Sequence, residues 1–213
     1  YNKGEEITAP EVLKRASEII ARPNVGRESE TYIHHMKTRS TDDRDFTVFS
    51  QGDPITHSPD FINILKNWRK WDDVQPLSWQ WVPDRSVPPK DALNRYEEHF
   101  PLHMRIRPEL FSLMDWEAIG FRDSGAWNMG LVFKTLEGTS PNTTNIAAHV
   151  LKKWKLDAYA ENAARHSVGV FSYGAIFAVR NEYVARLSDE TKELIYNFSI
   201  GEAHANGYIL ERM

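Results

Sequence analysis

The sequence predicts an α/β fold in a single domain, and three observations lead to that prediction. The length of 213 residues suits one domain of this class. The apolar run FTVF at residues 46–49, with β-branched residues at its centre, is typical of a buried strand. Amphipathic helical patterns lie on both sides of this strand, and no repeat, low-complexity tract or linker divides the chain. We therefore expect one domain spanning residues 1–213.

The composition excludes several classes of protein. Hydrophobic residues make up 41% of the chain and charged residues 26%, as in a compact globule. The net charge of −4 offers no basic surface for nucleic acid or for an anionic membrane, so we expect neither partner. The absence of cysteine excludes disulfides, thiolate nucleophiles and cysteine-ligated zinc.

Membrane insertion and cellular location are not fixed by the sequence. No apolar run approaches the roughly 18 residues of a membrane-spanning helix. The chain begins with Tyr1 rather than methionine, and we therefore expect the natural protein to be longer. The sequence does not identify the cellular compartment.

Hydrophobic periodicity, capping residues and turn residues predict the other elements. Helices are expected at 8–22, 28–37, 61–71, 91–99, 107–114, 145–156, from 181 onward, 188–198 and 202–213. Strands are expected at 168–171 and 175–179, an extended tryptophan- and proline-rich segment at 76–89, and a glycine-rich loop at 120–144 with a candidate strand at 131–133. The tryptophans of 76–89 suit either a platform for a sugar ring or ordinary core packing.

The turn after the strand at 46–49 is the first candidate site. Residues 50–54, SQGDP, end the strand, while Ser58 and Pro59 are typical of a helix start. We expect Gln51, Asp53 and His57 to cluster at the carboxyl end of this strand, the edge at which open α/β sheets bind ligands. The alternative is an ordinary turn in which the Asp53 carboxylate bonds its own backbone, and spacing alone favours that alternative.

A second candidate site is the loop at 24–28, NVGRE, which opens the helix at 28–37. If this loop neighbours the strand at 46–49, Gly26 allows a close backbone approach and Arg27 offers a planar fork to a phosphate. The alternative for Arg27 is a surface ion pair with Glu28 or Glu30, which is the commoner arrangement for such a residue.

The third informative stretch lies near the C-terminus. Between the strands at 168–171 and 175–179, Gly174 lets the backbone approach a ligand or a neighbouring strand. The final helix carries or adjoins Glu202, His204 and Glu211.

The order of these motifs resembles a family of unknown function that is related to the GT-A nucleotide-diphospho-sugar glycosyltransferases. The resemblance rests on NVGR at 24–27, QGD at 51–53, GAIFAV at 174–179 and ILER at 209–212, and it covers most of the chain, with the middle third weakest. It implies a GT-A-like (Rossmann-like) domain, with a mixed central sheet flanked by helices, that lacks its first strand in this sequence.

The resemblance also implies a metal site. In GT-A enzymes the turn after the central strand carries Asp-x-Asp, which holds Mn or Mg on the donor diphosphate. The corresponding turn here, Gln51-Gly52-Asp53, has one carboxylate, and an amide is a weaker ligand for a hard cation. Metal binding by Asp53 would therefore need help from His57, Glu211 or another residue.

By the same resemblance, the residues expected at the sugar-nucleotide donor are Asn24, Gly26, Arg27, Gln51, Asp53 and Gly174. Gly174 would also back the acceptor pocket. Glu211, or else Glu202, would be the general base that deprotonates the acceptor.

Three functions are left open by the sequence. The leading hypothesis is a hexosyltransferase-like enzyme that moves a sugar from a nucleotide-diphospho-sugar to a hydroxyl of a glycan or another acceptor. The alternative is a non-catalytic carbohydrate-binding or scaffolding relative of the same fold, which the single carboxylate at Asp53 favours. The third is a metal-dependent hydrolase built on Asp53, His57 and His204.

Overall fold

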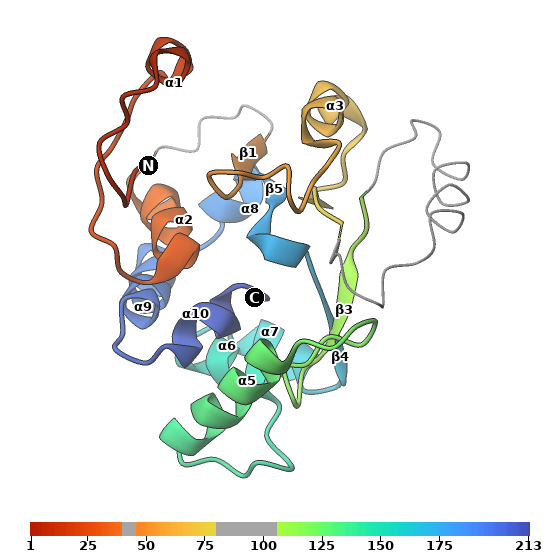
Figure 1. Cartoon of the computed structure of the whole chain (residues 1–213). Helices are drawn as coiled ribbons and strands as arrows, with labels where there is room; N and C mark the ends of the chain where they lie inside the picture. The colour runs from red at the N-terminus through yellow and green to blue at the C-terminus, as the bar shows by residue number, and fades with distance from the viewer. Residues whose placement is uncertain (40–45, 80–105) are drawn as a thin grey trace.

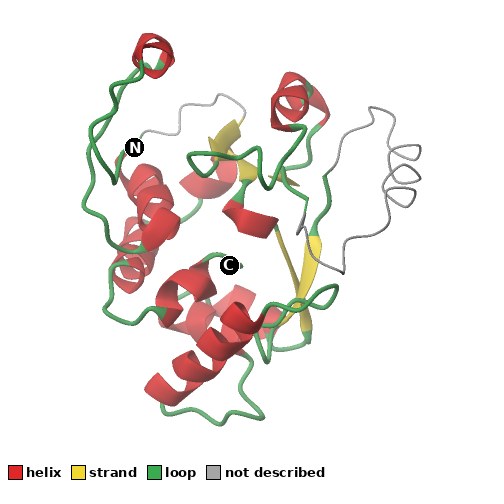
Figure 2. Cartoon of the chain, viewed as in Figure 1, coloured by secondary structure: helices red, strands yellow, loops and turns green. Residues whose placement is uncertain are grey.

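The computed structural model describes residues 1–39, 46–79 and 106–213. Within them, helices surround two small β-sheets, which confirms the predicted mixture of α and β structure (Figure 1, Figure 2). The helix expected at 91–99 and most of the segment at 76–89 lie outside the described residues.

The larger sheet has three strands in the order β1-β5-β2. Strand β1 (Phe46–Phe49) confirms the strand predicted at 46–49, and it lies at one edge, paired antiparallel with β5 (Phe177–Arg180) from Phe46↔Arg180 to Phe49↔Phe177. Strand β2 (Val74–Pro76) pairs antiparallel with the other edge of β5. The central position of β5 explains why Ala178 is fully buried. Both described sheets are antiparallel, whereas the resemblance implied one mixed sheet.

The second sheet is a two-stranded ribbon of β3 (Glu109–Ser112) and β4 (Val168–Phe171). The strand at 168–171 was predicted, but the helix predicted at 107–114 is wrong. Burial alternates along β3, because Glu109 and Phe111 are buried while Leu110 is 45% exposed. A Cβ on Gly169 would lie 2.5 Å from the Phe111 ring, so the glycine of β4 leaves room for that ring.

The described α-helices flank these sheets. Their bounds are α1 (Pro10–Arg15), α2 (Arg27–Thr38), α3 (Phe61–Lys66), α5 (Ser124–Leu136), α6 (Ile146–Lys153), α7 (Asp157–Ala163), α8 (Asn181–Ala185), α9 (Asp189–Ser199) and α10 (Ala205–Leu210). Short 3₁₀ turns occur at Trp68–Lys70 and Tyr173–Ala175. The side chains of Asn145 and Ser188 cap α6 and α9 by accepting a backbone N–H three residues further on.

Two helices differ from the sequence prediction at their ends. Helix α1 covers six residues, and none of them is buried, so the apolar face predicted for 8–22 has no covering element among the described residues. Helix α3 has Asp60 rather than the predicted Ser58 as its N-cap, and it ends at Lys66 rather than at 71. Ser58 is instead fully buried, where its hydroxyl donates a hydrogen bond to the Leu77 carbonyl.

The glycine-rich segment at 120–144 is helical over α5 rather than a loop with a strand at 131–133. Asp123 caps this helix by accepting a hydrogen bond of 3.1 Å from the Ala126 N–H. A Cβ on Gly130 would lie 2.9 Å from both the Asp115 carbonyl oxygen and the Trp116 Cβ. The glycine therefore serves close packing of α5, and this reason is invisible in the sequence.

The core consists of three clusters of buried hydrophobic side chains. The largest contains residues of α5, α6, α9 and α10 and of strands β3 and β4. Its side chains Trp116, Ile146 and Ile209 are fully buried. A second surrounds Ile64 and Ile176 between α3 and β5. The third contains Tyr32, Phe49 and Val179, and it fixes α2 against the β1-β5-β2 sheet.

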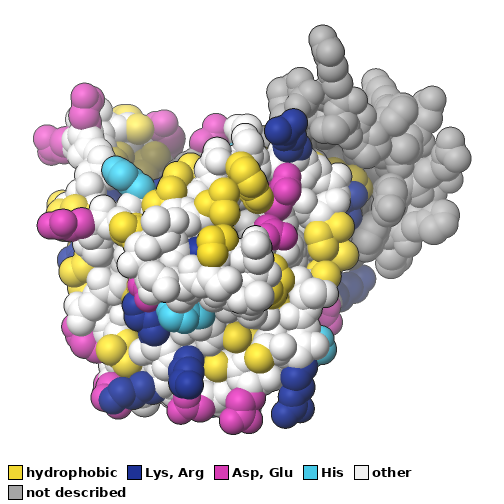
Figure 3. All heavy atoms as spheres, turned by 90° about the horizontal axis from the view of Figure 1, so that it is seen from below, with side chains coloured by type: hydrophobic (Ala, Val, Ile, Leu, Met, Phe, Trp, Pro, Cys, Tyr) yellow, Lys and Arg dark blue, Asp and Glu magenta, His cyan; other side chains and the backbone are white. Residues whose placement is uncertain are grey.

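Charges of both signs are interspersed on the molecular face of Figure 3, which agrees with the absence of a strong basic field in the sequence. Within the described residues, no helix has both the length and the apolar character needed to cross a membrane.

Candidate functional site: the groove between α2 and β1

A groove runs along α2 opposite β1 and the turn that follows it. Its larger lobe, about 440 Å³, is lined at one side by Asn24 and Arg27 and at the other by Gln51 and Gly52. Its smaller lobe, about 230 Å³, reaches His35 and strand β1 at Thr47, Val48 and Phe49. The two lobes share Tyr1, Thr31, Tyr32 and Ser50, so we treat them as one α2–β1 groove. The larger lobe has a size usual for small-molecule sites.

Gly26 determines how α2 enters the groove. Its φ of 61° lies in the left-handed region, and an added Cβ would come within 2.4 Å of the Ser199 carbonyl oxygen at the end of α9. Arg27 follows with a positive φ of 53°, which is unusual for a residue with a side chain. The close approach expected of Gly26 is therefore to the backbone of α9.

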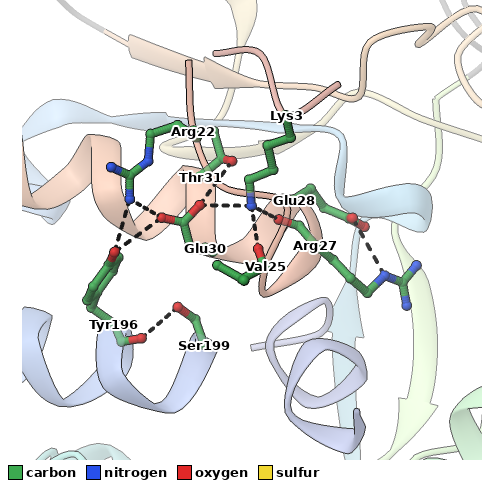
Figure 4. A network of polar contacts seen from close by, with 9 residues as sticks. All are labelled: Lys3, Arg22, Val25, Arg27, Glu28, Glu30, Thr31, Tyr196 and Ser199. Carbon is green, nitrogen blue, oxygen red and sulfur yellow. Dashed lines mark hydrogen bonds and ion pairs between the residues drawn. The ribbon is translucent and has the colours of Figure 1, made fainter. Parts of the chain in front are cut away.

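A fully buried carboxylate, Glu30, anchors the first turn of α2 (Figure 4). Its Oε2 lies 2.8 Å from the Lys3 ammonium, and its Oε1 accepts hydrogen bonds from Arg22 and, at 3.3 Å, from the Tyr196 hydroxyl. Burial opposes ionisation of Glu30, but the hydrogen bonds from Arg22 and Lys3 outweigh it and lower its pKa.

The Lys3 ammonium also ties down the loop that precedes α2. It donates hydrogen bonds to the Val25 carbonyl at 2.6 Å and to the Arg27 carbonyl. The Lys3 charge is thus shared between Glu30 and two backbone oxygens, and it fixes one wall of the groove.

Arg27 lines the larger lobe, and its guanidinium has part of its donor capacity unused. Its Nε is 3.7 Å from the Glu28 carboxylate, which is the surface pair expected as an alternative, and its Cζ stacks 4.7 Å above the Tyr208 ring centroid. The side chain is 46% exposed. Within the described residues, no hydrogen bond from its two terminal nitrogens is found, and Figure 4 shows them pointing away from the Glu30 network.

Tyr32 contributes a buried polar atom to the shared wall of the groove. Its side chain is 8% exposed, and its ring packs 4.8 Å from that of Phe49. Its hydroxyl has no hydrogen-bond partner in the part of the chain that is described. Burial raises the Tyr32 pKa, and the charges of Glu28 and Glu211 raise it further, so the hydroxyl stays protonated and can donate.

Glu211 follows α10 and lies close enough to the first turn of α2 to interact with its charges. Burial raises the Glu211 pKa, the Glu28 charge raises it further, and Arg27 and Arg212 oppose that rise. Arg212 is itself held by an ion pair with Asp123 and lies 4.5 Å from the Phe171 ring centroid. Glu211 does not line either described lobe.

Glu202, the other acid predicted as a base, lies elsewhere. It is exposed in the turn between α9 and α10 and does not line the described groove. The geometry thus favours Glu211 over Glu202 for a role near the groove.

The remaining predicted residues of the turn after β1 do not line the groove either. Asp53 is exposed, and its Oδ1 accepts a hydrogen bond of 3.3 Å from the Ile55 N–H, which is the local turn expected as an alternative. The His57 ring packs edge-on against Tyr173 at 5.0 Å. A Cβ on Gly174, whose φ is 66°, would lie 3.1 Å from His57 Cδ2, so this glycine makes room for the imidazole.

The pair predicted as metal ligands does not fit a Mn or Mg site. In the described ranges, no group of three or more His, Cys, Asp or Glu side chains could hold a metal ion. One Asp53 carboxylate oxygen already accepts a hydrogen bond from the Ile55 N–H. The Nδ1 atom of His57 is buried. Burial lowers the His57 pKa, and the charge of Asp53 opposes this shift. Hard cations take several oxygen ligands, so we derive no step through a metal here, and metal binding stays a prediction.

The hydrolase hypothesis finds no support in the same geometry. His204 is exposed at the start of α10, and it joins no metal-holding group with Asp53 and His57 in the described part of the chain.

Sequence reasoning missed part of the groove. Lys3 carried no motif, because its role depends on a buried acid from another segment. The unpartnered hydroxyl of Tyr32 could be found only from the packing around it.

Comparison of the chain with protein-family models, with curated proteins and with solved structures found no match. The fold and the groove describe an α/β protein with a polar groove at the N-terminal end of α2.

Proposed function

We propose that this chain is a glycosyltransferase that binds a nucleotide-diphospho-sugar in the α2–β1 groove and transfers the sugar to a hydroxyl acceptor. One observation carries the proposal. Residues from two separate segments, Asn24 and Arg27 before and in α2 and Gln51 and Gly52 after β1, line the same lobe of about 440 Å³. Asn24, Arg27 and Gln51 are residues that the GT-A resemblance puts at the donor, so the GT-A-like fold is part of this proposal.

Glu211, a buried acid that interacts with the charges of the first turn of α2, supports the chemistry. In the proposed reaction the acceptor oxygen attacks the anomeric carbon, the bond from that carbon to the diphosphate breaks, and the nucleoside diphosphate leaves with the bonding electrons. Glu211 takes the acceptor proton. A carboxylate whose pKa is raised is a stronger base than an ordinary one, and burial together with Glu28 raises that of Glu211.

A non-catalytic carbohydrate-binding relative is the second candidate function. The local hydrogen bond that Asp53 accepts from the Ile55 N–H favours it, because an oxygen of the only carboxylate in Gln51-Gly52-Asp53 is then already engaged. In that case the groove would bind a sugar ligand without turnover.

Incubation of the protein with a panel of nucleotide sugars and glycan acceptors, with detection of released nucleoside diphosphate, separates these functions. We expect release by the native protein and a fall in kcat of about 10²- to 10⁴-fold in Glu211→Gln, with little change in the KM for the donor. Glu202→Gln is the matched control and should keep the native rate, because Glu202 is exposed away from the groove. Glycan binding without release would favour the binding module.

The pH profile sharpens the assignment of the base. Because burial and Glu28 raise the Glu211 pKa, the rate should rise with pH through a value above the ordinary range of a glutamate and then level off. The residual activity of Glu211→Gln should lose this rise. An unchanged profile in the variant would remove Glu211 from the mechanism.

A further inference from the structure

Resting on the proposed function, we infer that the α2–β1 groove neutralises the donor diphosphate with fixed groups of the protein, Arg27 and the first turn of α2, rather than with a divalent metal ion.

The turn after β1 presents neutral groups to the groove. Gln51 and Gly52 line the larger lobe, whereas Asp53 lies outside it and bonds the Ile55 N–H. An amide side chain and a backbone can donate hydrogen bonds to a phosphate, but they are poor ligands for Mg or Mn. The side of the groove expected to hold a metal is therefore built to contact the phosphate directly.

The opposite wall provides backbone donors. Helix α2 has twelve residues, and its N-cap is Gly26, which has no side chain to satisfy the first amides. Those amides carry the positive end of the helix dipole, and the lining residues Arg27 and Glu28 place the groove at this first turn.

A second, independent feature points to a ligand at the same place. The Tyr32 side chain is more than nine-tenths buried, lines both lobes, and has a hydroxyl without a partner in the described structure. A buried donor without an acceptor is costly, and a ligand oxygen that reached this buried hydroxyl through the groove wall would satisfy it.

The charge balance of the lobe makes Arg27 the decisive cation. Lys3 is engaged by Glu30 and by two carbonyls, so its charge is already compensated. Arg27 has a contact of 3.7 Å from its Nε to Glu28, which leaves the two terminal nitrogens for a bidentate phosphate contact. The negative charge of Glu28 repels an anion in the same lobe. Arg27 and the first backbone amides of α2 have to outweigh this repulsion.

Glu28 therefore distinguishes the two ways of holding a diphosphate. If fixed cations bind the diphosphate, removing the Glu28 charge in Glu28→Gln tightens binding. If a metal ion bridges the protein and the diphosphate, the same substitution removes a nearby carboxylate and weakens binding.

The experiment is calorimetric titration with inorganic pyrophosphate, once with EDTA and once with MnCl₂. We expect the same Kd in both buffers, a loss of about ten- to hundredfold in Arg27→Ala, and a smaller loss in Arg27→Lys, which keeps the charge but not the fork. Glu28→Gln should bind about two- to fivefold more tightly. Circular dichroism of each variant reports whether it is folded.

Arg186→Ala is the matched control. Arg186 also pairs with a glutamate, Glu182 at 3.2 Å, and also stacks on a tyrosine at 4.6 Å, but it is the C-cap residue of α8 and does not line the groove. It should leave the Kd unchanged. Pyrophosphate binding that requires Mn and is lost in Asp53→Ala would overturn this inference and leave sugar transfer intact. An absence of binding in both buffers would overturn the inference as well, and the nucleotide-sugar release assay then decides separately whether the transferase proposal stands.

Discussion

The first turn of α2 and the turn after β1 line the same groove, yet they are held in place by different means. The first turn of α2 is fixed by long-range contacts, since Glu30 is fully buried among Lys3, Arg22 and Tyr196 and Gly26 packs on the end of α9. The turn after β1 is exposed around Gly52 and Asp53, and Asp53 is held by a contact to its own backbone. Donors that are fixed before a ligand arrives bind it with less loss of conformational entropy, so the α2 side is the better candidate for the anion site.

The same contrast appears in the sequence motifs. The GT-A resemblance puts the most weight on Gln51-Gly52-Asp53. In the structure, however, Arg27 is the residue held by long-range contacts, since its carbonyl accepts a hydrogen bond from Lys3 and its guanidinium stacks on Tyr208. A motif reports which residue types are present, but the contacts that hold them decide which of them can act as rigid donors.

The largest effect is expected for Glu30, the centre of the α2 anchor. Replacing it by alanine leaves the cations of Lys3 and Arg22 without their buried partner, which should lower the free energy of unfolding by about 3–5 kcal/mol. Urea unfolding measures this loss, and Glu193→Ala, which breaks an exposed pair with Lys37, is the control with little expected change.

The Glu30 anchor also predicts a pH dependence of stability. Because its hydrogen bonds to Arg22 and Lys3 lower the folded pKa of Glu30, its contribution is fully present above about pH 4.5 and is lost as the pH falls through the lower folded value. Glu30→Gln should remove this part of the acid dependence. If Glu30 contributes nothing to acid stability, the acid unfolding curves of Glu30→Gln and of the native protein will coincide.

A smaller effect is expected for Gly26→Ala. The new Cβ would lie 2.4 Å from the Ser199 carbonyl in a backbone with φ of 61°, so we expect a loss of about 3 kcal/mol from overpacking and left-handed strain. Gly138→Ala is a matched control, because Gly138 has a φ of 63° but nothing within 4 Å of the added Cβ. The control should lose about 1–2 kcal/mol from strain alone. Equal losses in the two variants would mean that the contact with α9 does not constrain α2.

The smallest effect is expected in the turn after β1. Asp53→Ala removes one exposed side-chain contact to the Ile55 N–H and should cost at most about 0.5 kcal/mol of stability in urea unfolding. Release of nucleoside diphosphate from nucleotide sugars should also be almost unchanged. A collapse of turnover in this variant would reverse the comparison and make the turn after β1 the more important side of the groove.

Much of the local structure could be predicted from the sequence. The strand at 46–49, the helices at 28–37 and 188–198 and the strand at 168–171 are confirmed, because periodicity and capping residues such as Ser188 act within a few residues of the element that they define. Three residues expected at the donor, Asn24, Arg27 and Gln51, line one lobe, and their role in donor binding stays a prediction.

Other features were decided by contacts between distant segments. Residues 109–112 form a strand because β4 pairs with them, and Gly130 lies within a helix because Trp116 packs against its bare backbone. The buried charge of Glu30 depends in the same way on Lys3, Arg22 and Tyr196, which come from other segments of the chain.

The sequence by itself determined the secondary-structure types with strong local signals, the lack of cysteine chemistry and the residue types available for binding an anion. Tertiary structure alone decided which of those residues share a groove and that the Tyr32 hydroxyl is left without a partner in the described residues. The physical reason is that burial and pairing depend on distances in space, which residue order along a chain does not specify.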